Sequence, residues 1–411
     1  MAKEFYLKHH SFHIKAIFTA LKGIFENNEY ADKAIEKVMK ANKYWDVRER
    51  GFVSEVTYDM VRNWRLMLAS SGVEPDAKLS DRTLWMIFGT YLVFDGYSLP
   101  ESNYFKGLSE KKVISQLEKF HKIRKIRESL PDWLDEMGEK EIGKDWDKVV
   151  RALNQKPTTV LRANSLKTNP KELLQILEEE SITEASLISW SPDAVELKFP
   201  RNVFRTEAFH KGLFEVQDAS SQMVSEFLNV QPGMRVVDAC AGAGGKTLHL
   251  ASLMKNKGRI IALDVKGKKL EELKKRAARA DVRIVETREI DSSKVVKRLK
   301  DTADRLLLDV PCSGLGVLRR NPDSKWKLNV EEIDRVKVLQ KEILTNFSDI
   351  TKVGGKMVYA TCSILLSEGE DQIKWFLSTT GDKWNLVGEK RYSPDVYHAD
   401  GFYMALLERM K

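Results

Sequence analysis

The chain contains 411 residues, of which 42% are hydrophobic and 31% charged, a composition that predicts two or three globular domains and excludes a largely disordered chain. No apolar run approaches the roughly 20 residues that cross a bilayer, and the N-terminal residues lack the apolar segment of a secretory signal. We therefore expect a cytoplasmic protein with no membrane partner. The formal net charge of +8 leaves nucleic-acid binding open, because the basic stretches 110–130 and 266–280 also carry acids at helical spacing.

The three cysteines are Cys240, Cys312 and Cys362. Their wide spacing excludes a CxxC zinc site, and their number is too small for a disulfide framework. We expect free thiols and no metal site.

Residues 1–140 are predicted to form a helical domain. Apolar residues recur at helical spacing in 30–41 and 52–71, without the alternation typical of strands. A proline in the segment 129–137 interrupts this pattern. Residues 141–227 are then predicted to form a small α+β module, with strands in 158–164 and 194–199 and a helix at 170–180.

From residue 228 to residue 411 strands and helices alternate, which predicts a doubly wound α/β domain with a mostly parallel sheet. Ligands of such sheets bind outside the carboxyl ends of the strands, so functional residues are expected there. The strand candidates are 235–239, 259–264, 283–287, 305–310 and 356–361, and the helices include 245–255 and 266–280.

The glycine-rich stretch VVDACAGAGGKTLHL (residues 236–250) at first resembles a phosphate-binding loop. A Walker A loop requires glycine where Cys240 stands, and a dinucleotide fingerprint requires a third glycine where Thr247 stands. The spacing therefore disfavours a P-loop ATPase or kinase. The glycines still allow a ligand to approach the backbone, and a helix starting near Lys246 offers free N–H groups, so a compact nucleotide-like ligand is favoured.

Acids gather at the carboxyl ends of the predicted strands. Asp238, Asp264, Asp291 and Asp309 each end or follow a strand. A single such acid is usually a helix cap or a turn residue, but four at one edge indicate a ligand site.

All three cysteines follow strands at this same edge, although a lone free cysteine is usually a small buried apolar residue. A thiolate here would be a nucleophile if nearby positive charge lowered the pKa of the thiol. The candidate sources of that charge are Lys246, Arg319 and Arg320.

Methyl transfer to C5 of a pyrimidine requires such a set of groups. A thiolate adds to C6 and makes C5 nucleophilic, an acid near N3 balances the developing charge, and a base removes the C5 proton so that the thiolate can leave. The methyl donor would be S-adenosylmethionine, whose ribose and adenine suit Asp264 and Asp291.

Three motifs in this order resemble the RsmB/Nop2/Sun family of RNA 5-methylcytosine methyltransferases. DACAGAGGKT (238–247) is similar to the cofactor loop of that family, residues 306–326 to its D-x-P-C-S segment, and MVYATCS (357–363) to its T-C-S motif. The resemblance implies a Rossmann-like methyltransferase domain at 228–411 that uses S-adenosylmethionine. Further similar segments are 161–168, 214–224 and 400–407.

The resemblance also implies roles for individual residues. Cys362 would be the nucleophile that forms a covalent adduct with C6, and Cys312 would assist release of the methylated product. Asp309 would support the target base, with Lys246 beside it in the catalytic site. S-adenosylmethionine would contact Cys240, Ala241, Gly242, Ala243, Gly244, Gly245, Lys246, Asp264, Asp291 and Asp309.

Two positions depart from the family pattern. Ala243 stands where the family has a proline in the cofactor loop, which relaxes φ but removes no hydrogen-bond donor. The loop after Cys362 keeps only Glu368 of the usual pair of acids, which leaves the details of that loop open.

Residues 49–64 resemble the NusB-like RNA-binding domain of the RsmB type, with Asp59 in place of a glycine. The resemblance implies a NusB-like domain at 1–140, an RNA-binding role for the 141–227 module, and small-subunit ribosomal RNA as substrate; a plain helical bundle is the alternative for 1–140. We expect a monomer. Two other functions stay open: a cytosine-C5 methyltransferase of transfer RNA, and a NusB-like RNA-binding or assembly factor without turnover.

Overall fold

The computed structural model describes residues 5, 7–74, 76–199 and 201–411. The chain forms two compact units. The first runs to Asn154 and also takes in Arg320–Asn329, and the second holds Gln155–Arg319 and Val330–Lys411. Within the described ranges, no helix is long and apolar enough to cross a membrane.

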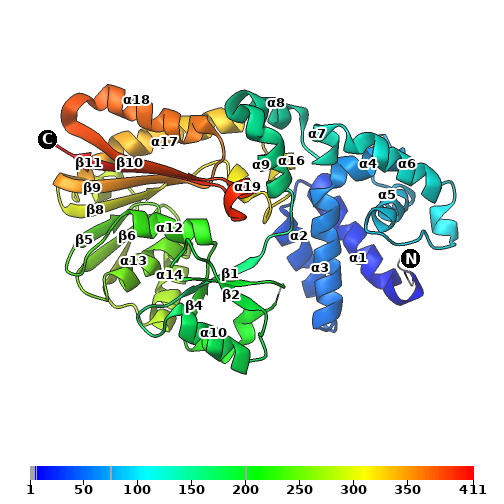
Figure 1. Cartoon of the computed structure of the whole chain (residues 1–411), viewed down its shortest axis with the longest axis horizontal. Coiled ribbons are helices and arrows are strands. Elements are labelled where there is room, and N and C mark those ends of the chain that lie inside the picture. The colour runs from blue at the N-terminus through cyan, green and yellow to red at the C-terminus, as the bar shows by residue number, and fades with distance from the viewer. Residues whose placement is uncertain (1–4, 6, 75, 200) are drawn as a thin grey trace. The chain divides into compact units, whose positions relative to one another are not determined.

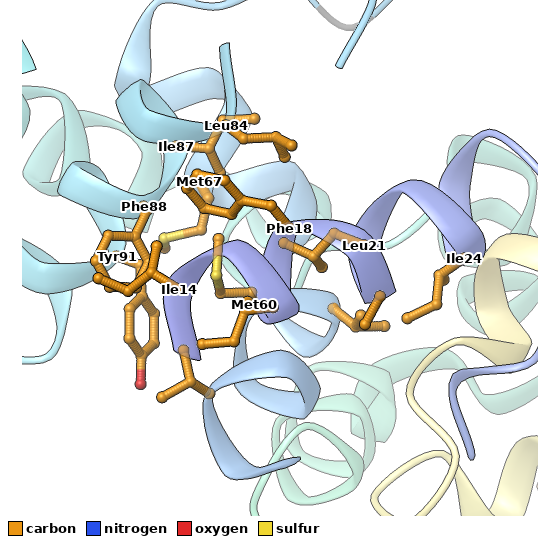
Figure 2. Close-up of a cluster of buried hydrophobic side chains, with 14 of the residues drawn as sticks. Ile14, Phe18, Leu21, Ile24, Met60, Met67, Leu84, Ile87, Phe88 and Tyr91 are labelled. Carbon is orange, nitrogen blue, oxygen red and sulfur yellow. The ribbon is translucent and has the colours of Figure 1, made fainter. Parts of the chain in front are cut away.

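The first unit is built from helices around one apolar core, as the periodicity of the sequence predicted. Figure 2 shows side chains from several of these helices packed together, among them Ile14, Phe18, Met60 and Phe88. Burying side chains of this kind supplies about 1.5–3 kcal/mol each. The helices are α1 (Leu7–Phe25), α2 (Ala31–Ala41), α3 (Val47–Arg62), α4 (Trp64–Ser71), α5 (Asp81–Phe94), α6 (Glu110–His121), α7 (Arg124–Arg127), α8 (Asp132–Ile142), α9 (Trp146–Leu153) and α16 (Ser324–Lys327).

Local sequence determines where several of these helices begin and end. Asp46 and Glu49 form a capping box at the start of α3, in which each side chain accepts a hydrogen bond from the other residue's backbone N–H. The helical pattern predicted over 52–71 is confirmed, but the helix breaks at Asn63, where ψ is 20°. Pro131 directly precedes α8, as expected for a residue that cannot donate a backbone hydrogen bond.

The segment Arg320–Asn329 belongs to the first unit although the sequence analysis placed it in the 228–411 domain. Trp326 Nε1 donates a hydrogen bond to the carbonyl of Val61 at 3.1 Å. The Asp323 carboxylate accepts from the backbone N–H of Ala31 at 2.9 Å. The helical core of the first unit is therefore completed by residues from far along the chain.

We expect Lys325→Met to destabilise the first unit, because Lys325 is only 2% exposed. Its Nζ donates to the carbonyls of Arg62 at 2.8 Å and Glu128 at 3.2 Å, and to Oδ1 of Asn154 at 3.2 Å. Methionine has a similar volume but no donor, so the free energy of unfolding measured in urea should fall by about 3 kcal/mol. Lys148→Met, at an exposed position, is the control, and an equally small effect of Lys325→Met would contradict the expectation.

The second unit contains a small sheet in the region where the sequence predicted an α+β module. Its four antiparallel strands have the order β2-β3-β1-β4, and α10 packs against one face through Leu173 and Leu177. Asn169 caps α10, and Pro170 occupies its first turn. The elements are β1 (Thr159–Ala163), α10 (Pro170–Glu179), β2 (Ala185–Leu187), β3 (Ala194–Leu197), α11 (Glu207–His210) and β4 (Phe214–Val216).

A seven-stranded sheet forms the rest of the second unit and confirms the Rossmann-like fold. Its strand order is β10-β11-β9-β8-β5-β6-β7, in which β11 is antiparallel to β9 and β10 and the other neighbours are parallel. From β5 the chain continues to β6 and β7 on one side of the sheet and then to β8 on the other side. Ligands of such sheets bind at this change of direction. The strands are β5 (Arg235–Asp238), β6 (Arg259–Asp264), β7 (Val285–Glu289), β8 (Ala303–Asp309), β9 (Thr351–Thr361), β10 (Trp384–Tyr392) and β11 (Phe402–Arg409).

Helices cover both faces of this sheet (Figure 1). Val224, Leu248 and Leu273 contribute to the apolar cluster on one face, and Leu344 and Phe376 to that on the other. The helices are α12 (Ala219–Phe227), α13 (Gly245–Leu253) and α14 (Gly267–Ala280) on the first face, α17 (Val330–Phe347) and α18 (Glu370–Thr380) on the second, and the short helices α15 (Ser293–Lys297) and α19 (Pro394–Tyr397).

The sequence pattern did not predict β10, α17 or α18. β10 is an edge strand, and its sequence WNLVGEKRY has few apolar residues because much of it is exposed. Its apolar residues are interrupted by Asn385, Gly388 and three charged residues, so it shows neither a continuous nor an alternating apolar pattern.

The division into domains at 140 and 227 remains a prediction about independent folding. The first compact unit extends to Asn154 because α9 packs directly on α8. A Cβ at Gly138 would lie 2.2 Å from Cε2 of Trp146, so glycine is required for this close approach. Trp146 Nε1 also donates to Asp135 Oδ1 at 2.9 Å.

Candidate functional site

The loop between β5 and α13 turns sharply at two glycines. Gly242 has a φ of 55° and Gly244 a φ of 88°, a left-handed conformation that favours glycine. A Cβ at Gly244 would lie 2.5 Å from Cγ of Leu273, so a side chain is excluded on steric grounds as well. At Gly242, in contrast, no atom lies within 4 Å of an added Cβ, so the backbone is open to a ligand.

Asp264, at the end of β6, orders this loop. Its Oδ2 accepts the backbone N–H of Gly242 at 2.9 Å, and its Oδ1 accepts that of Lys266 at 2.8 Å. The carboxylate is thereby held next to the open backbone of Gly242. An acid beside a glycine turn and the start of a helix suits the ribose of a nucleoside, so the residues present fit S-adenosylmethionine.

The small sheet and α14 hold the same loop from behind. Nη1 of Arg162, on β1, donates to the carbonyl of Gly245 at 2.5 Å and to Oε1 of Gln217. Arg276 of α14 donates to the carbonyl of Ala243 at 2.8 Å and to Glu215 at 2.9 Å. The carbonyl of Ala243 is therefore fixed by an arginine even though the proline expected from the family pattern is missing.

Asp291 and Cys240, which the resemblance assigned to the cofactor, differ from the other assigned residues in their surroundings. Asp291 is exposed, and its side chain accepts a hydrogen bond from Ser292 at 3.0 Å. The backbone N–H of the preceding residue, Ile290, donates to the carbonyl of Asp264 at 3.0 Å. Burial, together with three nearby carboxylates, raises the pKa of the Cys240 thiol. Cys240 therefore stays protonated at neutral pH, and we do not expect it to act as a nucleophile.

Lys246 and Asp309 form an ion pair at the carboxyl end of the sheet. Nζ of Lys246 lies 2.7 Å from Oδ2 of Asp309, and 5.0 Å from the centre of the Phe402 ring. Burial lowers the pKa of Lys246, but Asp309 and the sulfur of Cys362 outweigh it and raise the pKa overall. Lys246 is thus a positive charge close to Cys362, as the sequence suggested.

Arg319 binds backbone carbonyls of the second unit. Its guanidinium donates to the carbonyls of His398 at 2.7 Å and Lys156 at 3.3 Å, so it connects segments of the second unit. Arg320 belongs to the other compact unit.

The structure brings two of the three thiols together. Cys312 follows β8 and Cys362 follows β9, which are parallel neighbours, and their Sγ atoms lie 3.2 Å apart. The hydrogen bond with Cys362, reinforced by burial, raises the pKa of Cys312 well above its ordinary value. At neutral pH Cys312 is therefore a thiol that can donate to the sulfur of Cys362.

The two cysteine loops meet at Gly316. Its N–H donates to the carbonyl of Cys362 at 2.9 Å, and its carbonyl accepts from Gly401 at 2.8 Å. A Cβ at Gly316 would lie 2.1 Å from the oxygen of Gly401 and 2.8 Å from that of Cys362. Only glycine allows the loops to approach this closely.

Sequence reasoning gave no role to two residues that support the charged groups. Thr247 donates to Oδ2 of Asp238 at 2.7 Å, while burial raises the pKa of this carboxyl to about 7. Phe402 lies against Lys246. Thr247 stands next to Lys246 in the glycine loop and was recognisable there, whereas Phe402 carries no chemical signal in the sequence.

Asp193, Glu226 and His249 form a further cluster in the second unit. Nε2 of His249 lies 3.0 Å from Oδ2 of Asp193 and 3.7 Å from Oε1 of Glu226. His249 is fully buried, and burial lowers its pKa to about 4 despite Asp193. The arrangement is that of a neutral imidazole donating to a carboxylate.

This lowered pKa predicts acid sensitivity. Between about pH 6.5 and pH 4 the unfolded chain binds a proton at His249 that the folded protein does not, so stability present above pH 6.5 is lost as the pH falls. We expect His249→Gln to reduce the loss of unfolding free energy between pH 7 and pH 5 by on the order of 2 kcal/mol. Urea titrations at both pH values measure this difference. The exposed His210→Gln is the control, and an equal pH dependence in the two variants would contradict the expectation.

Comparisons with known proteins identify the family of the chain. Residues 225–408 match a family model described as 16S rRNA methyltransferase RsmB/F, and residues 130–204 match a ferredoxin-like domain of RsmF/B-like methyltransferases. The probable ribosomal RNA small subunit methyltransferase B of Synechocystis sp. is 31% identical over 440 residues, covering 95% of this chain and 98% of that protein.

Two further similarities differ in extent. The ribosomal RNA small subunit methyltransferase B of Proteus mirabilis is 34% identical over 281 residues, which cover 68% of this chain and 65% of that protein. The crystal structure of PH0851 superposes with a TM-score of 0.80 at 27% identity and covers 100% of both chains.

Proposed function

Since the chain belongs to the RsmB/Nop2/Sun family of S-adenosylmethionine-dependent RNA methyltransferases, we propose that it methylates C5 of a cytosine in small-subunit ribosomal RNA. The observation that carries this proposal is the pair of thiols, Cys312 and Cys362, 3.2 Å apart and close to Lys246 and Asp309. The ribosomal substrate is supported by the names of the relatives from Synechocystis sp. and Proteus mirabilis.

In the proposed reaction Cys362 is the nucleophile. Its thiolate, which lies close to the positive charge of Lys246, forms a bond to C6, and the electron pair of the C5–C6 double bond becomes available at C5. When bound, S-adenosylmethionine would supply the electrophilic methyl group that C5 takes up and would leave as S-adenosylhomocysteine, whose sulfur keeps the electron pair of the broken S–CH3 bond. Asp309, paired with Lys246 at 2.7 Å, is assigned to the N3 side of the base, where charge develops.

Cys312 is assigned to the release step. Once Cys362 is bonded to carbon, its sulfur no longer carries the charge that opposes ionisation of Cys312. Cys312 can then lose its own proton to water, and the resulting thiolate takes the C5 proton. The C5–C6 double bond forms again, and the bond between C6 and Cys362 breaks. The thiolate of Cys362 is thereby regenerated.

The target cytosine must leave the base stack, because C5 and C6 are reached from outside it. We assign RNA binding to the NusB-like region 1–140 and to the α+β module within 141–227, and propose that the protein acts as a monomer in the cytoplasm.

Mapping of 5-methylcytosine in cellular RNA by bisulfite sequencing, with and without the gene, tests the substrate. We expect one or a few cytosines in small-subunit ribosomal RNA to lose the modification, and the gene encoding Cys362→Ser to leave it absent. Loss confined to transfer RNA would make the chain a transfer RNA methyltransferase. Unchanged 5-methylcytosine in all RNA, together with no transfer in vitro, would instead support an assembly factor without turnover.

A further inference from the structure

Glu368 is a fully buried carboxylate that takes no part in the reaction steps above. Its Oε2 accepts the backbone N–H of Ser313 at 2.8 Å and Nε2 of Gln340 at 3.0 Å. Its Oε1 accepts the hydroxyls of Ser313 at 2.5 Å and Ser363 at 2.6 Å. Four donors therefore converge on one carboxylate, which compensates for removing its charge from water.

The two serines are the residues that directly follow the two thiols. Ser313 comes after Cys312 and Ser363 after Cys362, and the serine hydroxyls lie 3.2 Å from each other. The cysteine loops belong to different strands, and Glu368 is an acceptor that both share. A side chain that holds both serines also holds both neighbouring sulfur atoms.

Other contacts fix Glu368 itself. Gln340 of α17 donates from the same Nε2 to the carbonyl of Pro311 at 3.1 Å. The hydroxyl of Tyr359, on β9, donates to the carbonyl of Glu368 at 2.8 Å. The carboxylate therefore lies in a rigid setting made by the sheet and by the helix that covers it.

We propose that Glu368 is a positioning residue that sets the 3.2 Å separation of the Cys312 and Cys362 sulfur atoms by binding the serines that follow them. Its importance for methyl transfer rests on the proposed function, but its effect on the thiols does not. The charge of Glu368 also acts on Cys312. After the hydrogen bond with Cys362, burial and the charge of Cys362, it contributes to the raised pKa of Cys312.

The first test uses the protein without RNA or cofactor. Diamide oxidises two adjacent thiols: an S–S bond forms, both thiol protons are lost, and the N=N bond of diamide takes up two electrons and two protons. The rate of the Cys312–Cys362 disulfide is followed by mass spectrometry of peptides. We expect Glu368→Ala to slow it at least about 10-fold because the effective concentration of the thiols falls.

Two variants calibrate this result. Glu368→Gln keeps one acceptor oxygen and should give an intermediate rate. Asp371→Asn removes an exposed carboxylate from α18 and should leave the rate unchanged. Equal rates in Glu368→Ala, Asp371→Asn and the unchanged protein would overturn the proposal, as would failure of the unchanged protein to form the disulfide.

The second test is kinetic. Glu368→Ala should lower kcat by roughly 100-fold, as expected when reacting groups move by about 1 Å, with the Kd for S-adenosylmethionine from calorimetry unchanged. If the unchanged protein transfers no methyl group to RNA, the proposed function fails, while the disulfide rates still decide the role of Glu368.

Ser363→Ala covers the case in which Glu368→Ala does not fold, because it removes a single hydroxyl from the same contact. It should slow disulfide formation by an intermediate factor. Adding Glu368→Gln should then slow it by less than the product of the two single effects, since both changes remove the same hydrogen bond. Fully independent effects would overturn the proposed contact.

Discussion

Cys362→Ser is expected to abolish methyl transfer, with kcat reduced by roughly 10⁴-fold or more, because a serine hydroxyl is a far poorer nucleophile than a thiolate at neutral pH. The sulfur of Cys362 lies 3.2 Å from that of Cys312, and its charge interacts with that of Lys246. The serine hydroxyl at position 362 would lie among the same neighbouring residues but would be a far weaker nucleophile than the thiolate. Transfer of labelled methyl groups from S-adenosylmethionine to RNA measures the loss.

The interpretation of Cys362→Ser depends on an intact cofactor site. The glycine turn at Gly242 and Gly244 is ordered by Asp264 and Arg276 rather than by the thiols, so the Kd for S-adenosylmethionine should be unchanged in this variant. Normal turnover by Cys362→Ser would reject the nucleophile assignment. Weaker cofactor binding would show that the loss of activity has another origin.

Cys312→Ser is expected to trap the covalent intermediate. Cys362 can still add to the base and the methyl group can still be transferred, but the group assigned to remove the C5 proton is missing. A protein–RNA adduct that survives denaturation should then accumulate on a methylatable RNA, at a level close to one RNA per protein. A gel shift under denaturing conditions measures it.

The matched control for this adduct is the double variant Cys312→Ser, Cys362→Ser, which lacks the nucleophile and should form none. Absence of an adduct in Cys312→Ser, with an RNA that the unchanged protein methylates, would remove Cys312 from the release step. Adduct formation by the double variant would place the covalent bond on a residue other than Cys362.

The distance between the thiols has a consequence for their protonation. The hydrogen bond, burial and the charge of Cys362 all disfavour a second negative charge on Cys312. The state in which both sulfur atoms carry a negative charge is therefore disfavoured. The structure thus supports a division of roles between two residues of the same type.

The sequence by itself identified the architecture and the sheet edge at which the candidate site lies. Alternating strands and helices predicted the sheet, because burial of apolar strands and of one helix face is a local property of the pattern. It also placed Cys312, Cys362 and Asp309 at one edge, because the ends of neighbouring parallel strands meet there. These conclusions needed only the order of residues along each strand.

Other features were decided by tertiary structure alone. Glu368 accepts a hydrogen bond from Ser313, which lies 55 positions earlier in the chain. Lys325 donates hydrogen bonds to Arg62 and Asn154, both more than 170 positions earlier. The contacts of Arg319 with the carbonyls of His398 and Lys156 and the exposure of Asp291 are likewise features that the sequence did not predict. The paths of loops depend on contacts between distant segments, and no periodicity within the loop itself records them.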